Sequence, residues 1–356
     1  MTRTQRTKKD KGAASSRAER TATAPGRGFD DVLGNSRIKK ILRLAMEKGR
    51  IPNSLIFSGP RGVGKRRLAL LLAQGLNCER GTVEPCGECR ACRKIAEDKY
   101  PDVVVVKPEG QSIKIEQMQD VRQGAYIRPL EARQRVFIIP EAEKMTPDAA
   151  NCLLKILEEP PAYSHLILVT SMAHLILPTI RSRCQILNFS PIGREEIKGA
   201  LMEAGSPEER AGAMALLVNG NLEEALELDW DEVQKHRQEA WDLFAALQGR
   251  GDSTAFIRNY AFSKRDEVRD GFEKVLRLTA TFCRDAGLLK SGGDPSLLLN
   301  PDYVDALRNL ESGWGPEEYA RCLNTIEQAM AGLKKSLNLS LLVMSFYLLM
   351  GEVSHG

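Results

Sequence analysis

The sequence lacks an apolar stretch long enough to cross a membrane. Its longest apolar run, Leu337 to Gly351, is interrupted by Asn338 and Ser340 and falls short of the roughly 20 apolar residues that a spanning helix needs. The N-terminal residues carry charge but no apolar core of a signal peptide. We therefore expect a cytoplasmic protein without a signal peptide, in which the run at 337–351 forms a buried helix.

A strongly basic folded region is also lacking. The formal net charge is +4, but residues 1–28 alone contribute +6, so the remainder of the chain is −2. Charge is therefore no argument for nucleic-acid binding by the folded part. Residues 1–28 have no apolar periodicity, which predicts a disordered basic tail that is either simply solvated or a tether for nucleic acid.

The 356 residues suit two or three domains. From Phe29 to about residue 190, short apolar segments alternate with amphipathic helical ones, and the apolar segments lie at 54–58, 102–106, 135–139, 165–170 and 185–189. This pattern predicts an α/β domain over 29–190, built on a five-stranded parallel sheet with helices on both faces. After Pro191 the strands stop. We expect a small helical unit over 191–235 and an all-helical domain over 236–356.

The segment from Gly59 to Lys65 matches the first seven positions of the phosphate-binding motif G-x-x-x-x-G-K-[ST], between a strand and a helix. Gly59, Gly62 and Gly64 would let backbone N–H groups surround phosphate oxygens, and Lys65 would reach the outer phosphates. The eighth position is Arg66, which cannot supply the hydroxyl that binds Mg²⁺. The alternative is a tight strand-to-helix turn without a ligand.

The strand at 135–139 has a second defect of the same kind. Nucleotide hydrolases place Asp-Glu at this point, but here the strand runs into Pro140-Glu141. Glu141 could orient a water molecule, or it could be a solvated residue at a strand end. Two lost metal-binding positions predict that Mg²⁺ does not bind and that the chain hydrolyses no ATP at its own site, while binding of ATP or ADP stays open.

Four of the eight cysteines lie close together in the sequence, at Cys78, Cys86, Cys89 and Cys92. Two successive C-x-x-C steps and one preceding cysteine are typical of a structural Cys₄ zinc site, with an iron–sulfur site or free thiols as alternatives. The acids and bases around the cluster balance, which argues against a DNA-binding zinc protein; they are Glu79, Glu84, Glu88, Arg80, Arg90 and Arg93.

Three further segments carry a family resemblance: 29–34 (FDDVLG), 151–161 (NCLLKILEEPP) and 177–185 (LPTIRSRCQ). Together with the phosphate loop and the Cys₄ module at 78–92, they resemble the AAA+ clamp loaders of bacterial DNA polymerase III over about residues 29–190. The resemblance implies an AAA+ domain with Thr170 at its sensor position, a helical lid over 191–235 and a helical collar over 236–356.

Within that family the chain is similar to the delta-prime members. The gamma/tau motor subunits carry complete nucleotide motifs and a lid arginine, whereas this chain has Arg66, Pro140 and, in the lid, Glu223. An isolated Arg183 would be read as a surface charge. The resemblance instead implies that Arg183 is an arginine finger, given in trans to a neighbouring ATPase.

The resemblance therefore implies a non-hydrolysing subunit of the DNA polymerase III holoenzyme, without polymerase activity of its own. Its partners would be the gamma/tau and delta subunits and, indirectly, the beta sliding clamp and primed DNA. The competing interpretation is an active gamma/tau-type ATPase.

Overall fold

The computed structural model describes residues 28–250, 258, 260–261, 266–309, 314–334 and 337–355. These residues form two compact units. Unit 1 comprises the described residues up to Glu203 together with Val218–Glu227, and unit 2 comprises Ala204–Leu217 and the described residues from Leu228 onward. The predicted basic tail at 1–28 lies, except for Gly28, outside the described residues, and the domain boundaries at 190 and 235 stay predictions.

Unit 1 is built on the predicted five-stranded parallel sheet, with the strand order β2-β3-β4-β1-β5. The strands are β1 (Ser54–Ser58), β2 (Val103–Val105), β3 (Arg135–Ile139), β4 (Ser164–Thr170) and β5 (Gln185–Asn188). All residues of β1 and β4 are buried, as expected for strands covered on both faces. Since β3, β4 and β1 are neighbours, the loops that follow them meet at one edge of the sheet.

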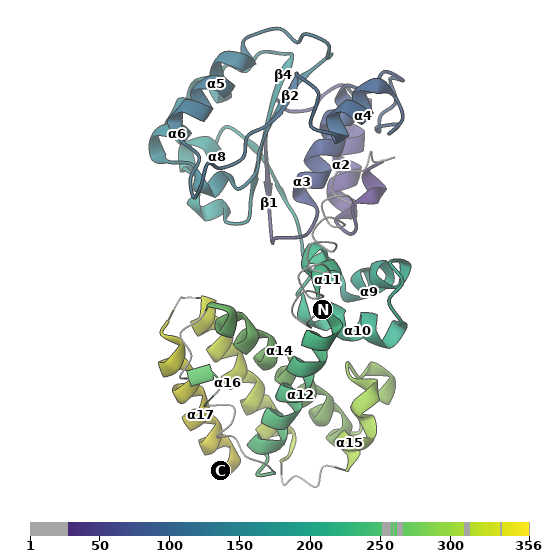
Figure 1. Ribbon diagram of the computed structural model, residues 1–356, viewed down its shortest axis with the longest axis vertical. Helices are drawn as coiled ribbons and strands as arrows, with labels where there is room; N and C mark the ends of the chain where they lie inside the picture. Colours follow the sequence, from purple (N-terminus) through teal and green to yellow (C-terminus); the bar gives the residue numbers. More distant parts are fainter. Residues whose placement is uncertain are drawn as a thin grey trace, which may run out of the picture. The chain divides into compact units, whose positions relative to one another are not determined.

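Helices cover both faces of this sheet (Figure 1). On one side lie α2 (Ser36–Glu47), α3 (Lys65–Leu76) and α4 (Arg90–Ala96), and on the other lie α5 (Ile115–Ala125), α6 (Pro147–Cys152) and α8 (Pro178–Arg181). The second group packs its apolar residues on Ile56, Phe137 and Leu168 of the strands. The α/β fold class predicted from alternating apolar segments is confirmed.

The helix predicted over 147–158 is divided into α6 and α7 (Leu154–Glu158). Its beginning is as expected: the Thr146 side chain accepts a hydrogen bond from Ala149 N (3.3 Å), with Pro147 in the first turn. The division occurs at Leu153, whose N–H bonds to the Ala150 oxygen three residues back. This local tightening of the helix carries no sequence signal that we can identify.

Unit 1 also contains α9 (Arg194–Glu203) and α11 (Leu222–Glu227), whereas α10 (Glu208–Leu217) groups with unit 2. The remaining helices of unit 2 are α12 (Trp230–Leu247), α14 (Asp266–Lys290), α15 (Val304–Arg308), α16 (Pro316–Lys334) and α17 (Leu339–His355). An aromatic group of Trp241, Phe244, Phe282 and Tyr303 joins α12 to α14. Helix α14 packs along both α12 and α16, so it is the central helix of the unit.

Helix α17 corrects the expectation of a fully buried helix at 337–351. Val343, Phe346 and Met350 are buried, but Leu341 and Leu348 are 72% and 65% exposed. The run is apolar on all sides, so its sequence alone could not show that only one face packs against the unit. In the part of the chain that the structure describes, no helix is long and apolar enough to cross a membrane.

Candidate functional site: a phosphate loop, a cysteine cluster and an exposed arginine

The predicted phosphate loop has the expected strand–loop–helix form. It leaves β1 at Ser58 and enters α3 at Lys65, and Gly59, Gly62 and Gly64 have φ angles of 148°, 67° and 82°. These left-handed values favour glycine. A Cβ atom at Gly62 would overlap the Asn221 side chain. The loop therefore needs glycine both for its curvature and for the close approach of the segment before α11.

Lys65 is turned toward its own loop. Its Nζ donates hydrogen bonds to the carbonyl oxygens of Gly59 (2.7 Å) and Pro60, and the residue is buried. Burial lowers the pKa of the Lys65 ammonium to about 8, although the nearby Glu143 and Glu223 carboxylates favour its charged form. The lysine predicted to reach phosphates is thus hydrogen-bonded within its own loop.

The two acids after β3, Glu141 and Glu143, have different surroundings. Glu141 has a left-handed φ of 52°, and its carboxylate pairs with Lys144 Nζ at 2.6 Å. Glu143 instead faces the loop after β4, where it accepts a hydrogen bond from Ser171 Oγ (2.7 Å). Burial works against the charged form of Glu143, but hydrogen bonds from Ser171 and Thr170 hold its pKa below the usual value. Sequence reasoning missed Glu143, although its position two residues after Glu141 was a usable signal.

Thr170, the residue placed at the sensor position by the family resemblance, lies beside the phosphate loop. It is the last residue of β4, pairs in register with Ser58 of β1, and is buried. Its carbonyl oxygen accepts a hydrogen bond from Gly59 N (3.3 Å), and its Oγ1 accepts one from Met172 N (3.0 Å). The strand order alone brings Thr170 and the phosphate loop together.

The start of α11 and the preceding Asn221 contact the phosphate loop from the other side. Leu222 N donates to the Gly62 carbonyl oxygen (3.1 Å), and Asn221 Oδ1 accepts from Glu224 N (3.2 Å). Glu223, the acid noted in the sequence, is close enough to affect Lys65 electrostatically. The loop is therefore surrounded by Asn221, Glu143 and Glu223, a polar and acidic environment for a phosphate site.

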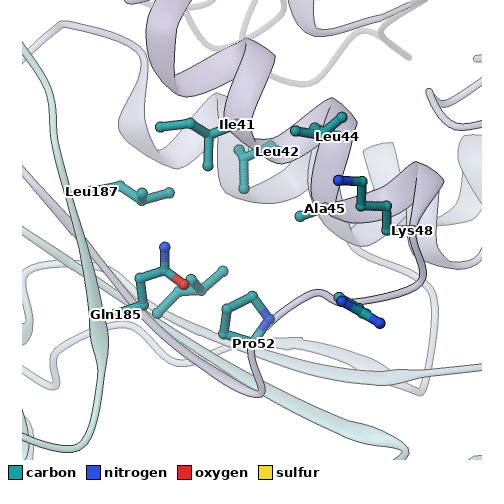
Figure 2. Close-up of a pocket in the computed structure, with 10 residues that line it drawn as sticks. Ile41, Leu42, Leu44, Ala45, Lys48, Pro52, Gln185 and Leu187 are labelled. Carbon is teal, nitrogen blue, oxygen red and sulfur yellow. The ribbon is translucent and has the colours of Figure 1, made fainter.

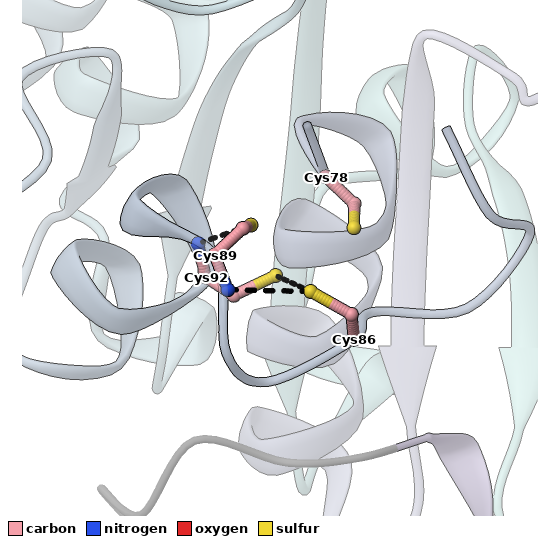
Figure 3. Close-up of side chains that lie close together, drawn as sticks. All are labelled: Cys78, Cys86, Cys89 and Cys92. Atoms are coloured by element: carbon pink, nitrogen blue, oxygen red, sulfur yellow. Dashed lines mark hydrogen bonds between the residues drawn. The ribbon is translucent and has the colours of Figure 1, made fainter. Parts of the chain in front are cut away.

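The four clustered cysteines meet as predicted (Figure 3). Their Sγ atoms all lie within 4.8 Å of one another, with Cys78 and Cys92 buried. A tetrahedral site with Zn–S bonds of about 2.3 Å has ligands roughly 3.8 Å apart, and the Sγ atoms of Cys86 and Cys92 are 4.0 Å apart. The four thiols could therefore bind a metal ion such as zinc with little movement.

Two tight turns shape the cluster. Cys89 N donates to the Sγ of Cys86 (3.3 Å) and Cys92 N to the Sγ of Cys89 (3.4 Å), and α4 starts directly after Cys89. Burial disfavours the Cys78 thiolate, but hydrogen bonds from Cys86, Thr82 and Arg80 lower the pKa of Cys78 to about 6. Burial raises the pKa of Cys92, so a cation is needed to hold that sulfur as a thiolate.

Arg183 lies between α8 and β5 on the surface of unit 1. Its Nη2 donates to Glu158 Oε1 (2.7 Å) and its Nη1 to the Thr179 carbonyl oxygen (3.0 Å), and its side chain is 36% exposed. It precedes β5, whereas the phosphate loop follows β1. Since these strands pair in parallel, Arg183 lies at the amino-terminal ends of the strands, and the phosphate loop lies at their carboxyl-terminal ends.

An apolar hollow of about 280 Å³ lies between α2 and β5 (Figure 2). Its charged lining residues, Lys48 and Arg50, are both cations, and its lining within the described chain includes no carboxylate, cysteine or histidine. It therefore has no acid–base pair or nucleophile for catalysis. Its other lining residues are Ile41, Leu42, Leu44, Ala45, Pro52, Leu55, Gln185 and Leu187.

The chain is similar to several known proteins. The sequence model of the family described as "DNA polymerase III, delta subunit" matches residues 34–193. The "DNA polymerase III subunit delta'" of Bacillus subtilis is 33% identical over 280 residues, which are 77% of this chain and 82% of that protein. The "DNA polymerase III subunit tau" of the same organism is 34% identical over 79% of this chain but only 49% of that protein. Among solved structures, the Thermotoga maritima RuvB Holliday junction branch migration motor matches with a TM-score of 0.43 and 18% identity, over 80% of this chain and 91% of that one.

Proposed function

The chain belongs to the DNA polymerase III clamp-loader family of delta-prime, gamma and tau subunits, and from this membership we propose that it acts as the delta-prime subunit. In this role it hydrolyses no ATP itself. It contributes Arg183 to the ATP site of a neighbouring subunit while the assembly loads a sliding clamp onto primed DNA. The observation that carries the proposal is the exposed Arg183 combined with the loss of two cation-binding positions, one at Arg66 after the phosphate loop and one at Pro140 after β3.

The state of the phosphate loop supports the first half of this proposal. Arg66 replaces the hydroxyl that would bind Mg²⁺, and Pro140 replaces the carboxylate that would hold it through water. Lys65 is hydrogen-bonded to its own loop. A nucleotide would have to displace these contacts and approach Glu143 and Glu223, which repel phosphate oxygens.

The position of Arg183 supports the second half. Arg183 and the phosphate loop are separated by about a strand length, roughly 15 Å, so Arg183 does not serve the loop of its own chain. Its partly exposed guanidinium has a planar fork of N–H donors, which fits the oxygens of a transferring phosphoryl group. In a clamp-loader assembly, these phosphate oxygens would belong to an ATP molecule that is bound to a neighbouring subunit.

Two further features fit a subunit of an assembly. The Cys₄ cluster offers four protein ligands and no open coordination position, so we assign it a structural zinc ion. Helix α17 exposes Leu341, Met344 and Leu348 at helical spacing, next to the exposed Leu337. An apolar stripe of this kind marks a contact with another protein, and we assign it to the other clamp-loader subunits.

Steady-state ATPase measurements on the reconstituted assembly test the proposal. Arg183→Ala should lower the rate at one interface by about 10²-fold or more and leave assembly, followed by size-exclusion chromatography, unchanged. Arg181→Ala is the matched control, because Arg181 is an exposed arginine two residues away. Equal rates for Arg183→Ala and the wild type would overturn the trans role.

The competing function is an active ATPase of the gamma/tau type. It is favoured by the identity to tau, which equals that to delta-prime within one per cent, and by the intact glycine geometry of the phosphate loop. Titration of the isolated chain with a fluorescent ATP analogue distinguishes the two. Tight binding that requires Mg²⁺ would support the motor function, whereas absent or Mg²⁺-independent binding supports the delta-prime role.

A further inference from the structure

Two cysteines outside the zinc cluster are in close contact inside unit 2. Cys283 on α14 and Cys322 on α16 are both 0% exposed, and their Sγ atoms lie 3.0 Å apart. This separation is about 1 Å longer than a disulfide bond and shorter than the 4.0 Å between Cys86 and Cys92. The sulfurs are therefore placed so that a small movement would bring them to bonding distance.

The packing of the two helices holds this pair in place. Helices α14 and α16 run against each other. On α16 the cysteine shares its buried face with Tyr319 and Ile326, at helical spacing, and on α14 it follows the buried Phe282. The pair thus belongs to the seam of a helix–helix contact, where neither sulfur can move away without opening the seam.

A metal site does not account for the pair. Among the described residues, the one group of three or more clustered ligand-type side chains is Cys78, Cys86, Cys89 and Cys92. Cys283 and Cys322 lack the third and fourth ligands that a zinc ion takes in a structural site. Their chemistry is that of two neighbouring thiols.

We propose that Cys283 and Cys322 form a redox-active dithiol, which closes to an intrachain disulfide when the chain meets a disulfide oxidant such as oxidised glutathione. One cysteine thiolate attacks a glutathione sulfur, forming a mixed disulfide and releasing one glutathione thiolate, which takes up a proton. The second cysteine thiolate attacks the protein sulfur of the mixed disulfide and releases the second glutathione. Both protein thiols are thereby oxidised, and one glutathione disulfide is reduced to two thiols.

The burial of the pair determines when this happens. Only the thiolate is a nucleophile, and burial raises the pKa of Cys283 well above its usual value. Glutathione also needs access to a sulfur that has no exposed surface. Disulfide formation therefore requires opening of the seam between α14 and α16, so its rate should follow the local unfolding of unit 2.

Once formed, the disulfide closes a loop that contains the 38 residues between the two cysteines. Cross-links over loops of this length restrict the unfolded chain, and a gain of about 5–10 °C in the melting temperature of unit 2 is the expected scale. The bond would tie together the two helices that precede α17, which carries the exposed apolar stripe.

Mass spectrometry on the full-length chain tests the proposal. The protein is incubated in buffers with increasing ratios of oxidised to reduced glutathione, with and without urea below the unfolding transition. The exchange is stopped with acid and glutathione is removed; the chain is then denatured, its remaining thiols are alkylated with iodoacetamide at about pH 8, where they are partly thiolate, and it is digested without reduction. We expect a linked peptide that joins Cys283 to Cys322, forming faster in urea, together with a rise in melting temperature that dithiothreitol reverses.

Both deciding measurements are made on the wild-type chain, so the test does not depend on whether a cysteine variant folds. If Cys283 and Cys322 both carry the alkyl label under conditions that oxidise Cys152 or Cys184, the proposal is wrong. A melting temperature that dithiothreitol does not change would overturn it as well. The Cys283→Ala and Cys322→Ala variants should each lose the linked peptide and the dithiothreitol-sensitive shift.

Discussion

Arg183 Nη2 donates a 2.7 Å hydrogen bond to Glu158 Oε1, so the arginine assigned to a neighbour's ATP site is paired within its own chain. Both side chains are partly exposed, at 36% and 51%, and such pairs contribute at most about 1 kcal/mol. The contact is therefore weak enough for a nucleotide phosphate to replace it. We therefore expect Arg183 to exchange its ion pair with Glu158 for contacts with ATP phosphates when a neighbouring subunit binds.

Removal of this partner should make Arg183 easier to engage. In the assembly, Glu158→Gln should lower the ATP concentration at half-maximal rate by up to about five-fold, which corresponds to about 1 kcal/mol. The control is Glu159→Gln, because Glu159 is the adjacent exposed glutamate. It should leave the ATP concentration at half-maximal rate unchanged. An increase with Glu158→Gln would instead mean that the carboxylate orients Arg183 for catalysis.

The burial of Lys65 predicts a pH dependence of stability. Its pKa is lowered to about 8 in the folded chain, from 10.5, so between these values the unfolded chain binds more protons than the folded one. Stability contributed by this group therefore rises with pH over about 8 to 10.5, by up to about 1.4 kcal/mol per unit. Below pH 8 the penalty for the buried charge is fully present.

Denaturant unfolding at pH 8 and pH 10 measures this effect, with Lys65→Met as the reference variant, because the subtraction removes the titration of all other groups. We expect the free energy of unfolding of the wild type, minus that of Lys65→Met, to be larger at pH 10 than at pH 8. A constant difference between the two proteins would show that Lys65 titrates normally and is more exposed than the structure indicates.

Metal removal should destabilise unit 1. The segment between α3 and α4 is held by few buried apolar side chains besides the cysteines, so loss of a bound ion would release its turns and leave four close thiols. Treatment with a chelator such as 1,10-phenanthroline should lower the melting temperature by about 5 °C or more, and metal analysis should find one zinc ion per chain. Cys92→Ser should abolish metal retention, whereas Cys152→Ser, which changes a cysteine outside the cluster, should preserve it.

The apolar stripe on α17 predicts an assembly defect without unfolding. Leu341 is 72% exposed, so Leu341→Lys should change the stability of the isolated chain by less than about 0.5 kcal/mol. In an interface the same charge would be buried without a partner, at a cost of several kcal/mol. Co-purification with the partner subunits should therefore fail for Leu341→Lys and succeed for Leu297→Lys, which alters another exposed leucine of unit 2.

Local sequence patterns determined much of this protein. Short, mostly apolar segments bounded by turn residues predicted each of the five strands. This signal is clearest for β1 and β4, which are buried along their whole length, and weaker for the edge strand β5, whose Gln185 and Asn188 are exposed. The glycines around the phosphate loop and the spacing of the four cysteines predicted their local geometry for a similar reason. A short segment with a demanding backbone, or a set of ligands on tight turns, is specified by residues that are near one another in the chain.

Tertiary structure decided which distant residues meet. The strand order places Thr170 beside Gly59, and Glu143, not Glu141, bonds to Ser171 after β4 and lies near enough to affect Lys65. No local pattern contains that order. The partners of Arg183 and Cys283 were invisible for the same reason, since Glu158 and Cys322 lie 25 and 39 residues away along the chain. The exposed side of α17 also depended on packing, because a helix that is apolar all round gives no sign of the face it buries. Contacts of this kind follow from how whole elements pack, which hydrophobic periodicity within one element does not record.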